Sequence, residues 1–151
     1  MAFGQTTNQR NGSAGRIPAY SFHVEIAGII EGAFLKCKGL SAERKVFQYK
    51  EGGVNNYVHQ LPDRLQYGKV TFERGVAFSN QLWDWFMTGQ HTGHVRRANI
   101  SVILFATDGG PAKRWNLINA FPTKWTAPSL ETQSKTASIE SLVIVHHGIS
   151  M

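Results

Sequence analysis

The six histidines are the first residues whose chemistry could build a site, because neutral imidazoles bind transition metals. His91 and His94 lie three positions apart in the polar loop GQHTGHVRR, but no third ligand stands at a useful spacing. His146 and His147 are adjacent in a strand-like segment, so their side chains point to opposite faces and cannot share an ion. The sequence therefore predicts no metal site.

Residues that could act in catalysis are equally scattered. The single cysteine, Cys37, excludes an internal disulfide, and its place between Lys36 and Lys38 predicts a small buried hydrophobe on the face opposite both lysines. No carboxylates are brought together, and no G-x-S-x-G elbow, phosphate-binding glycine loop or Cys–His signature occurs. We therefore predict no catalytic residue, no cofactor and no enzymatic activity.

Aromatic and basic residues could serve nucleic-acid binding, but their distribution argues against it. Trp83 and Trp85 fall on the apolar stripes of a predicted helix and Trp115 on one face of a predicted strand, which favours packing over base stacking. The formal net charge is +6, yet the Lys and Arg residues are dispersed, and no groove-reading motif accompanies them. A dedicated role in DNA binding is therefore not expected.

The composition indicates one domain with an unusually uncharged surface. The length of 151 residues suits a single domain that can bury a core. Only 17% of the residues are charged, against about 25% in an average soluble domain, as is typical of a subunit covered by copies of itself. No apolar signal region and no membrane-spanning run of ~18 residues is visible, so we expect folding in a bacterial cytoplasm without a membrane partner.

The pattern along the chain predicts a flexible arm over residues 1–17 and a single β-rich domain over residues 18–151. The arm is rich in Gly, Asn, Gln, Ser and Thr, whereas apolar and polar residues alternate along most of the domain. Asp108-Gly109, followed by Gly-Pro, predicts a hairpin turn. The segments with strand-like alternation are 20–26, 33–38, 45–50, 67–74, 98–106, 112–121 and 135–147.

One segment, residues 79–89, changes to a helical period. Ser79 is a favourable N-cap, and Gly89 is a favourable residue after the last turn. The apolar side chains form two neighbouring stripes, one with Leu82, Trp85 and Phe86 and one with Trp83 and Met87. A helix buried on one side shows a single stripe, so we predict that this helix is covered on two sides.

Two predicted strands are apolar on both faces, which is unusual for an antiparallel sheet with one face in water. A barrel interior accounts for one face, and the helix together with a neighbouring copy accounts for the other. The predicted fold class is mainly β, an antiparallel β-barrel or sandwich with one flanking α-helix. The residues expected to contact a neighbouring copy are Trp83, Met87, Phe105, Val143 and Val145.

Several segments, taken in order, give the chain a resemblance to a known family. They read GLSAERKVFQYKEGG, a loop ending in LPDR, YGKVTFERGV, LWDWF, RWNLINAFPTKWTAPSL and ASIESLVIVHHG. From Ile17 to Gly148 the chain resembles the inner tube proteins of contractile injection machines, which include the tail tube subunits of T4-like phages. No single motif is diagnostic, and Asp63 stands where the family commonly has Gly. The aromatic segment through Trp125 is more similar to the injection-system members than to phage T4.

The resemblance implies a β-barrel subunit that forms hexameric rings, which stack into a hollow tube inside a contractile sheath. It implies as partners the sheath protein, baseplate and spike proteins, and a cargo or tape-measure protein in the lumen. It also implies a final place in an extracellular or phage tail-like particle.

The segment EGGVNNYVHQLPDR, residues 51–64, is longer than the two to five residues that usually join two strands. In the family, the loop between the early strands reaches the adjacent ring, so this segment is predicted to be a docking loop. Its Gly and Asn pairs tolerate unusual backbone angles, and its apolar residues supply surface to bury. The predicted docking residues are Gly53, Val54, Asn55, Asn56, Tyr57, Val58, Leu61, Pro62 and Asp63.

Two alternatives stay open. The same fold serves as the tail tube of a contractile-tailed phage, which conducts DNA, and nucleic acid is a partner only in that case. A small ligand-binding β-barrel would belong to another class and would need a polar pocket, whereas the predicted inward faces carry Val, Ile, Leu and Trp.

Overall fold

The structure is a computed structural model that describes residues 19–27, 34–76, 79–133 and 138–151. The predicted arm over residues 1–17 lies outside the described residues. The described part of the chain forms nine β-strands and one short α-helix, so the predicted mainly β class with one helix is confirmed. The elements are β1 (Ala19–Ile26), β2 (Phe34–Lys38), β3 (Ala42–Tyr49), β4 (His59–Tyr67), β5 (Val70–Gly75), α1 (Gln81–Met87), β6 (Ala98–Ala106), β7 (Pro111–Thr126), β8 (Ile139–Val145) and β9 (Gly148–Ser150).

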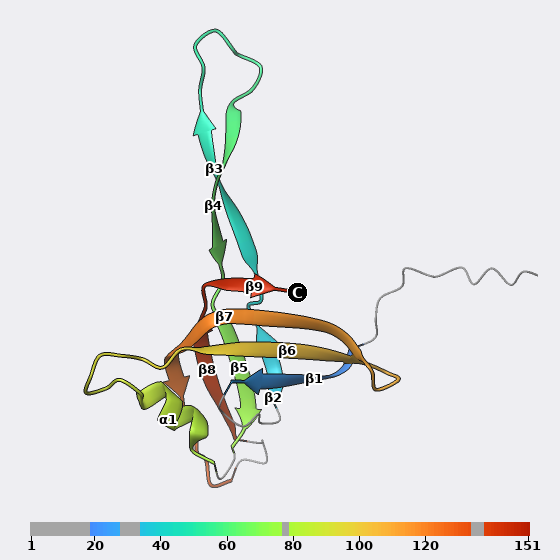
Figure 1. The fold of residues 1–151 in the computed structure, drawn as a ribbon, viewed down its shortest axis with the longest axis vertical. Coiled ribbons are helices and arrows are strands. Elements are labelled where there is room, and N and C mark those ends of the chain that lie inside the picture. Colours follow the sequence, from blue (N-terminus) through green and yellow to red (C-terminus); the bar gives the residue numbers. More distant parts are fainter. Residues whose placement is uncertain (1–18, 28–33, 77–78, 134–137) are drawn as a thin grey trace, which may run out of the picture.

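Seven strands form one antiparallel sheet in the order β1-β6-β7-β8-β5-β2, with β9 paired to β7. The sheet folds over into two layers, in which β1 and β6 run across β8, β5 and β2 (Figure 1). Strand β7 belongs to both layers, because its first half pairs with β6 and β9 and its last residues pair with β8. The bend in β7 falls at Asn119, which has a positive φ of 51° and is stabilised by a hydrogen bond from its N–H to Asn99 Oδ1.

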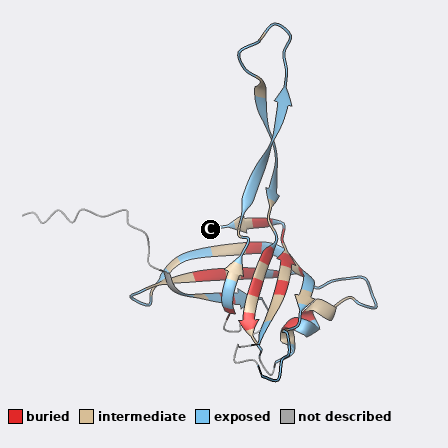
Figure 2. Ribbon diagram, turned by 180° about the vertical axis from the view of Figure 1, so that it is seen from behind, coloured by how far each residue is buried: buried red, intermediate tan, exposed pale blue. Residues whose placement is uncertain are grey.

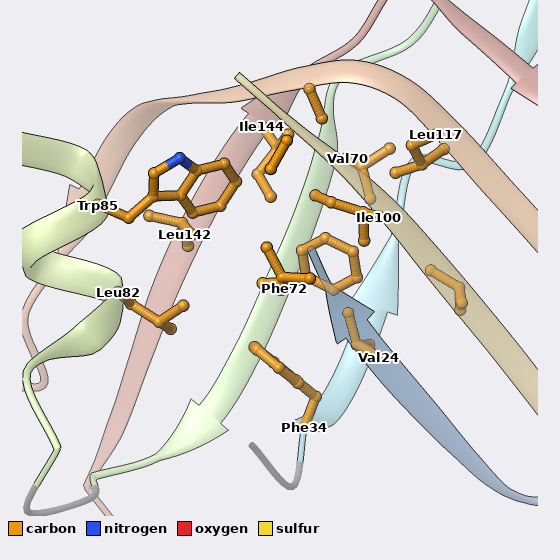
Figure 3. Packing of buried hydrophobic residues seen from close by; sticks show 14 residues of the cluster. Val24, Phe34, Val70, Phe72, Leu82, Trp85, Ile100, Leu117, Leu142 and Ile144 are labelled. Atoms are coloured by element: carbon orange, nitrogen blue, oxygen red, sulfur yellow. The ribbon is translucent and has the colours of Figure 1, made fainter. Parts of the chain in front are cut away.

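The hydrophobic core lies between the two layers and is closed on one side by α1. Figure 3 shows Leu82 and Trp85 of α1 pointing toward Leu142 of β8 and toward Phe72 of β5. The two-residue alternation of the sequence explains how β5 packs in the core, because the residues of β5 are alternately buried and half-buried along the strand. Alternation over the predicted strand 67–74 places Val70 and Phe72 on the inward face, and both side chains are fully buried.

The other two strands, β3 and β4, form a separate two-stranded antiparallel sheet. This hairpin rises from the two-layered body and stands apart from it (Figure 1). Its residues are exposed almost throughout, whereas buried residues gather in the body (Figure 2). Eight residues of β3 extend about 26 Å at ~3.3 Å per residue.

The hairpin corrects two predictions about this part of the chain. The connection predicted over residues 51–64 is a loop only from 50 to 58, because β4 already begins at His59. The strand predicted over residues 67–74 is divided at Gly68, where the hairpin joins the body. A side chain on Gly68 would overlap the Ser41 hydroxyl, and one on Gly39 would overlap the Lys69 carbonyl, so both glycines are needed where the two legs meet.

Strand boundaries differ elsewhere for local reasons. Residues 122–126, which lie beyond the predicted strand 112–121, form the last part of β7, and the strand passes Pro122 through a register shift. Strand β8 ends at Val145, and the beginning of the predicted strand, residues 135–137, lies outside the described residues. Within β2, Leu35 is exposed and Cys37 is half-buried, because an irregularity in the strand turns Phe34 into the core.

The helix is shorter than predicted. It runs from Gln81 to Met87 with Asn80, not Ser79, at the N-cap. Gly89 follows the last turn with a φ of +84°, as its predicted position required. The Asp108-Gly109 turn is confirmed: the Gly109 N–H donates to the Ala106 carbonyl, and Gly109 has a positive φ.

We predict that Phe72→Ala lowers the free energy of unfolding by about 3–5 kcal/mol, because it removes a fully buried ring and leaves a cavity beside Phe34, whose ring centroid lies 5.4 Å away. Leu130→Ala is the matched control, since 85% of Leu130 is exposed, and should change stability by no more than about 0.5 kcal/mol. Urea unfolding followed by tryptophan fluorescence measures both. Equal losses would contradict the described core.

We also predict that Cys37 is unreactive in the folded protein. Burial raises the pKa of the Cys37 thiol to about 11, so the reactive thiolate is scarce at neutral pH. At pH 8 a disulfide reagent should modify Cys37 about tenfold to a hundredfold more slowly in the native protein than in urea. Equal rates would show that the side chain is open to solvent.

Candidate functional site

Among the described residues, the β3–β4 hairpin carries the largest group of exposed large apolar side chains. Residues that share this character are Val46, Phe47, Tyr49, Tyr57, Leu61 and Leu65. An isolated two-stranded hairpin is marginally stable in water, and exposed apolar side chains on it favour association. The hairpin is therefore the candidate functional site, and its function is contact with another molecule.

Both faces of the hairpin are apolar. Phe47 pairs directly with Leu61 and lies two residues from Tyr49, so these three side chains share one face. Val46 pairs with Pro62 on the opposite face. Pro62 is tolerated because β4 pairs with β3 on one side and leaves its other edge unpaired among the described strands. A partner that covers this hairpin would have to reach around it.

The tip of the hairpin, residues 50–58, is held by its own contacts. His59 Nε2 lies 2.8 Å from Glu51 Oε2 across the base of the tip. The Tyr57 ring meets the His59 ring edge-on with centroids 5.0 Å apart. Gly53 adopts a φ of +92°, which an L side chain rarely adopts, beside a hydrogen bond from the Val54 N–H to the Glu51 carbonyl. Tyr57 is 61% exposed at this ordered tip.

The predicted docking residues divide between two elements. Gly53, Val54, Asn55, Asn56, Tyr57 and Val58 lie in the tip loop, whereas Leu61, Pro62 and Asp63 lie in β4, which corrects their assignment to a loop. Sequence reasoning missed Phe47, Tyr49 and Leu65 as parts of the same surface. The signal that could have found Phe47 and Tyr49 is the alternation within the predicted strand 45–50, whereas Leu65 lies beyond a register shift that interrupts the alternation of β4.

The base of the hairpin is fastened to the body by aromatic and polar contacts. The Tyr67 ring at the end of β4 packs on the buried His146 ring, with centroids 5.4 Å apart. His146 Nδ1 lies 3.1 Å from the Gly148 carbonyl at the start of β9. His147 is exposed beside it, in agreement with the prediction that the two histidines face opposite ways. His146 thus serves packing at the hairpin base.

The predicted second stripe of α1 is partly uncovered. Trp83 remains 39% exposed, and its ring contacts the Phe86 ring and, edge-on at 4.8 Å between centroids, the Trp125 ring. Met87 is half-buried. Leu82 and Trp85 of the first stripe are buried, and the Trp85 indole N–H donates to the Arg96 carbonyl at 2.8 Å. The two stripes therefore have different environments.

The remaining predicted contact residues are also half-buried but do not form one surface with Trp83. Val143 and Val145 lie on the face of β8 opposite Leu142 and Ile144, which are in the core. Phe105 lies near the end of β6 that turns into β7, and β6 begins at the side where α1 lies (Figure 1). Whether these residues meet a neighbouring copy stays a prediction.

A cavity of about 430 Å³ opens beside α1. A buried ion pair lies on one wall, where the Arg74 guanidinium contacts the Glu140 carboxylate. Arg74 Nη2 also donates to the Ser79 carbonyl at 3.3 Å, and Trp125 Nε1 donates to Glu140 Oε2 at 3.2 Å. The residues that line the cavity are Arg74, Val76, Ser79, Asn80, Trp83, Trp125, Pro128 and Glu140.

Within residues 19–27, 34–76, 79–133 and 138–151, no three His, Cys, Asp or Glu side chains come together as a potential metal site. His91 and His94 lie in the exposed turns that follow α1. No helix in that part of the chain has the length and apolar character needed to cross a membrane.

The two-layered β-fold and the apolar hairpin that projects from it define a β-rich structural subunit. Residues 18–150 match the family described as T4-like virus tail tube protein gp19. The chain belongs to this tail tube family, as the sequence resemblance predicted. A search of curated proteins finds no match.

Solved structures agree with this assignment. One chain from the sheath–tube complex of an extracellular contractile injection system, called PVC, in the extended state, is 25% identical with a TM-score of 0.81, and the match covers 97% of each chain. A chain from the tube-terminating cap of the anti-feeding prophage has 24% identity and a TM-score of 0.82 over 96% of each chain. Hcp1 from Flavobacterium johnsoniae shares the fold at 17% identity and a TM-score of 0.55, covering 87% of this chain and 94% of its own.

We predict that Glu140→Gln lowers the free energy of unfolding by about 3–5 kcal/mol, because it leaves the buried Arg74 charge without its counter-ion. The matched control is Glu25→Gln, which breaks the half-exposed pair with Arg114 and should cost less than about 1 kcal/mol. Chemical denaturation measures both variants. A small loss for Glu140→Gln would show that the pair is open to solvent.

Proposed function

We propose that this chain is a non-catalytic subunit that forms hexameric rings, and that the rings stack into the hollow inner tube of a phage-tail-like contractile injection system. Its membership of the tail tube family and its similarity to a chain of a sheath–tube complex support this assignment. The observation that carries it is the projecting hairpin, whose apolar side chains have no place in the chain's own core. A tube delivers a spike or cargo when its sheath contracts, and no cofactor is needed for that.

Stacking of rings would cover the hairpin. Each ring would offer six hairpins to the next ring, so each single contact can be weak. If each contributes only ~2 kcal/mol, six together contribute ~12 kcal/mol, which corresponds to nanomolar affinity before the costs of association. Free subunits would then stay dispersed while rings hold together firmly. The docking residues in this proposal are the tip loop and the outer halves of β3 and β4.

Lateral contacts within a ring would be heterologous, with one side of each subunit against the other side of the next. Strands β1 and β2 are the two ends of the seven-stranded sheet, and each pairs on one side among the described strands. Closing a ring would cover such edges, which otherwise invite aggregation. Trp83, Met87, Phe105, Val143 and Val145 are the side chains that we expect to face other copies.

The partners in this proposal are the contractile sheath outside the tube, the baseplate and spike at its end, and a cargo or tape-measure protein in the lumen. Subunits would fold in a bacterial cytoplasm and leave it as part of an extracellular particle. Each copy adds a formal charge of +6, so a ring of six would carry a strong positive field toward whatever surface those charges face. An acidic sheath or acidic cargo fits that sign.

The tail tube of a contractile phage is the second candidate, because the matched family is described from T4-like viruses. The two candidates share the fold and differ in what the lumen conducts. Nuclease treatment and nucleic-acid staining of purified particles separate them, since a phage tube passes DNA. A small ligand-binding barrel is disfavoured, because the space between the two layers is filled by buried apolar side chains (Figure 3).

We predict that shortening the tip stops stacking without unfolding the subunit. Tyr49 pairs directly with His59, so residues 50–58 can be replaced by Asn-Gly, the preferred two-residue hairpin turn. Rings should persist and tubes should disappear in electron micrographs, while the melting temperature stays within a few degrees of the parent. The matched control inserts Asn-Gly at the exposed 107–110 turn between β6 and β7, which should leave tubes intact.

Two outcomes would overturn this prediction. Tubes that form normally with the shortened tip would show that the hairpin does not join rings. Loss of the folded state, measured by circular dichroism, would show that residues 50–58 belong to the core instead.

A further inference from the structure

The cavity beside α1 lies at the end of the molecule opposite the hairpin. In Figure 1 the hairpin tip is at one end of the long axis, and α1 with the neighbouring end of β5 is at the other. A stack of identical rings brings the upper end of each subunit against the lower end of a subunit in the next ring. In such a head-to-tail contact, two different surfaces of one chain must complement each other.

The cavity has the chemistry of a receptor for an aromatic side chain. Trp83 and Trp125 meet edge-on at 4.8 Å and form an apolar wall, and Trp83 keeps 39% of its surface exposed. Asn80 lines the cavity and begins α1 without a side-chain capping hydrogen bond, so its amide is not committed to the helix. A volume of about 430 Å³ falls in the range of pockets that bind small organic groups, ~300–1,000 Å³.

The charged side chains that line the cavity do not oppose the binding of an uncharged group. The Arg74 and Glu140 charges on the cavity wall neutralise each other, and their hydrogen bonds to Ser79 and Trp125 hold them in place. A lone ionic ligand would have to compete with this pair. A neutral aromatic group with a hydroxyl fits better, because its ring can pack on the indoles while its hydroxyl bonds with polar groups of the wall.

The tip of the hairpin offers such a group. Tyr57 is 61% exposed and is held by the edge-on His59 ring. Its neighbours Asn55 and Asn56 are exposed and uncharged. The charged Glu51 at the tip is engaged by His59 at 2.8 Å. Lys50 and Glu51 give the tip one positive and one negative formal charge, so the tip and the cavity are each net neutral, and both are part aromatic and part amide in character.

We propose that in the stacked tube the hairpin tip of one subunit, led by Tyr57, inserts into the Trp83–Trp125 cavity of a subunit in the adjacent ring. The proposal rests on the proposed tube function and deepens it by naming the receptor of the docking tip. It makes Trp83 an axial contact between rings rather than a lateral contact within a ring. The energy of docking is then concentrated in buried aromatic side chains, as at other protein interfaces.

Disulfide trapping tests the contact directly. In a Cys37→Ser background, Asn55→Cys places a thiol in the hairpin tip and Asn80→Cys places a thiol in the wall of the cavity. Oxidation of assembled tubes should produce a ladder of dimers, trimers and longer chains on a non-reducing gel, because tip-to-cavity contacts run head to tail without closing. The matched control pairs Asn55→Cys with Thr107→Cys, which is exposed on the β6–β7 turn, and should give no ladder.

The outcomes of the cross-linking experiment distinguish failure of the tip-to-cavity contact from failure of the proposed tube function. Tubes that are visible by electron microscopy yet give no ladder with the cavity cysteine would overturn the proposal and leave the tube function standing. Cross-linking that stops at a closed band of one ring would place a lateral neighbour in the cavity and would also overturn it. Failure of the unmodified chain to form rings or tubes with its own baseplate would remove the tube function and this proposal together.

A second measurement tests whether Tyr57 and Trp83 contribute to the same contact. Tyr57→Ala and Trp83→Ala should each raise the concentration at which half of the chain sediments as tubes by about tenfold or more. The double variant should be no worse than either single variant, because both remove the same contact. Thr107→Ala, an exposed change on the β6–β7 turn, is the control and should stay within about twofold. Effects that multiply in the double variant would contradict direct contact.

Discussion

The structure depends on one imbalance: the chain has more apolar side chains than its own core can cover. The two-layered body buries a compact cluster from Val24 to Ile144, whereas the hairpin holds Phe47, Tyr49 and Leu61 in water. A two-stranded sheet cannot shield both of its faces. The low fraction of charged residues follows from the same cause, since surface that other copies cover needs no charge to stay soluble.

The body must hold the hairpin in a fixed direction for this surface to be useful. The two legs meet at Gly39 and Gly68, where any side chain would collide with the opposite leg. Tyr67 then packs on His146, next to the point where β9 joins the long strand β7. Because β7 belongs to both layers, a force on the hairpin base passes into the whole core.

The sequence was informative wherever one local pattern decided the outcome. The inward Val70, the turn at Asp108 and the glycine after α1 were all predictable, because alternation and turn chemistry act over a few residues. Strand β4 was missed because Pro62 is typical of a loop, although an unpaired strand edge tolerates proline. The Arg74–Glu140 pair, 66 residues apart, has no local signal and appears only when β5 and β8 are brought together.

The separation of the two candidate contact surfaces has a consequence for how a tube can grow. A protein whose tip and cavity lie at opposite ends of one axis cannot satisfy both on a single partner, so each added layer exposes a fresh set of tips or cavities. Growth is then unlimited unless another protein covers the last layer. In the proposed tube, weak single contacts multiplied by a ring would make such growth firm along the axis, yet they would leave a free subunit little tendency to begin a tube alone.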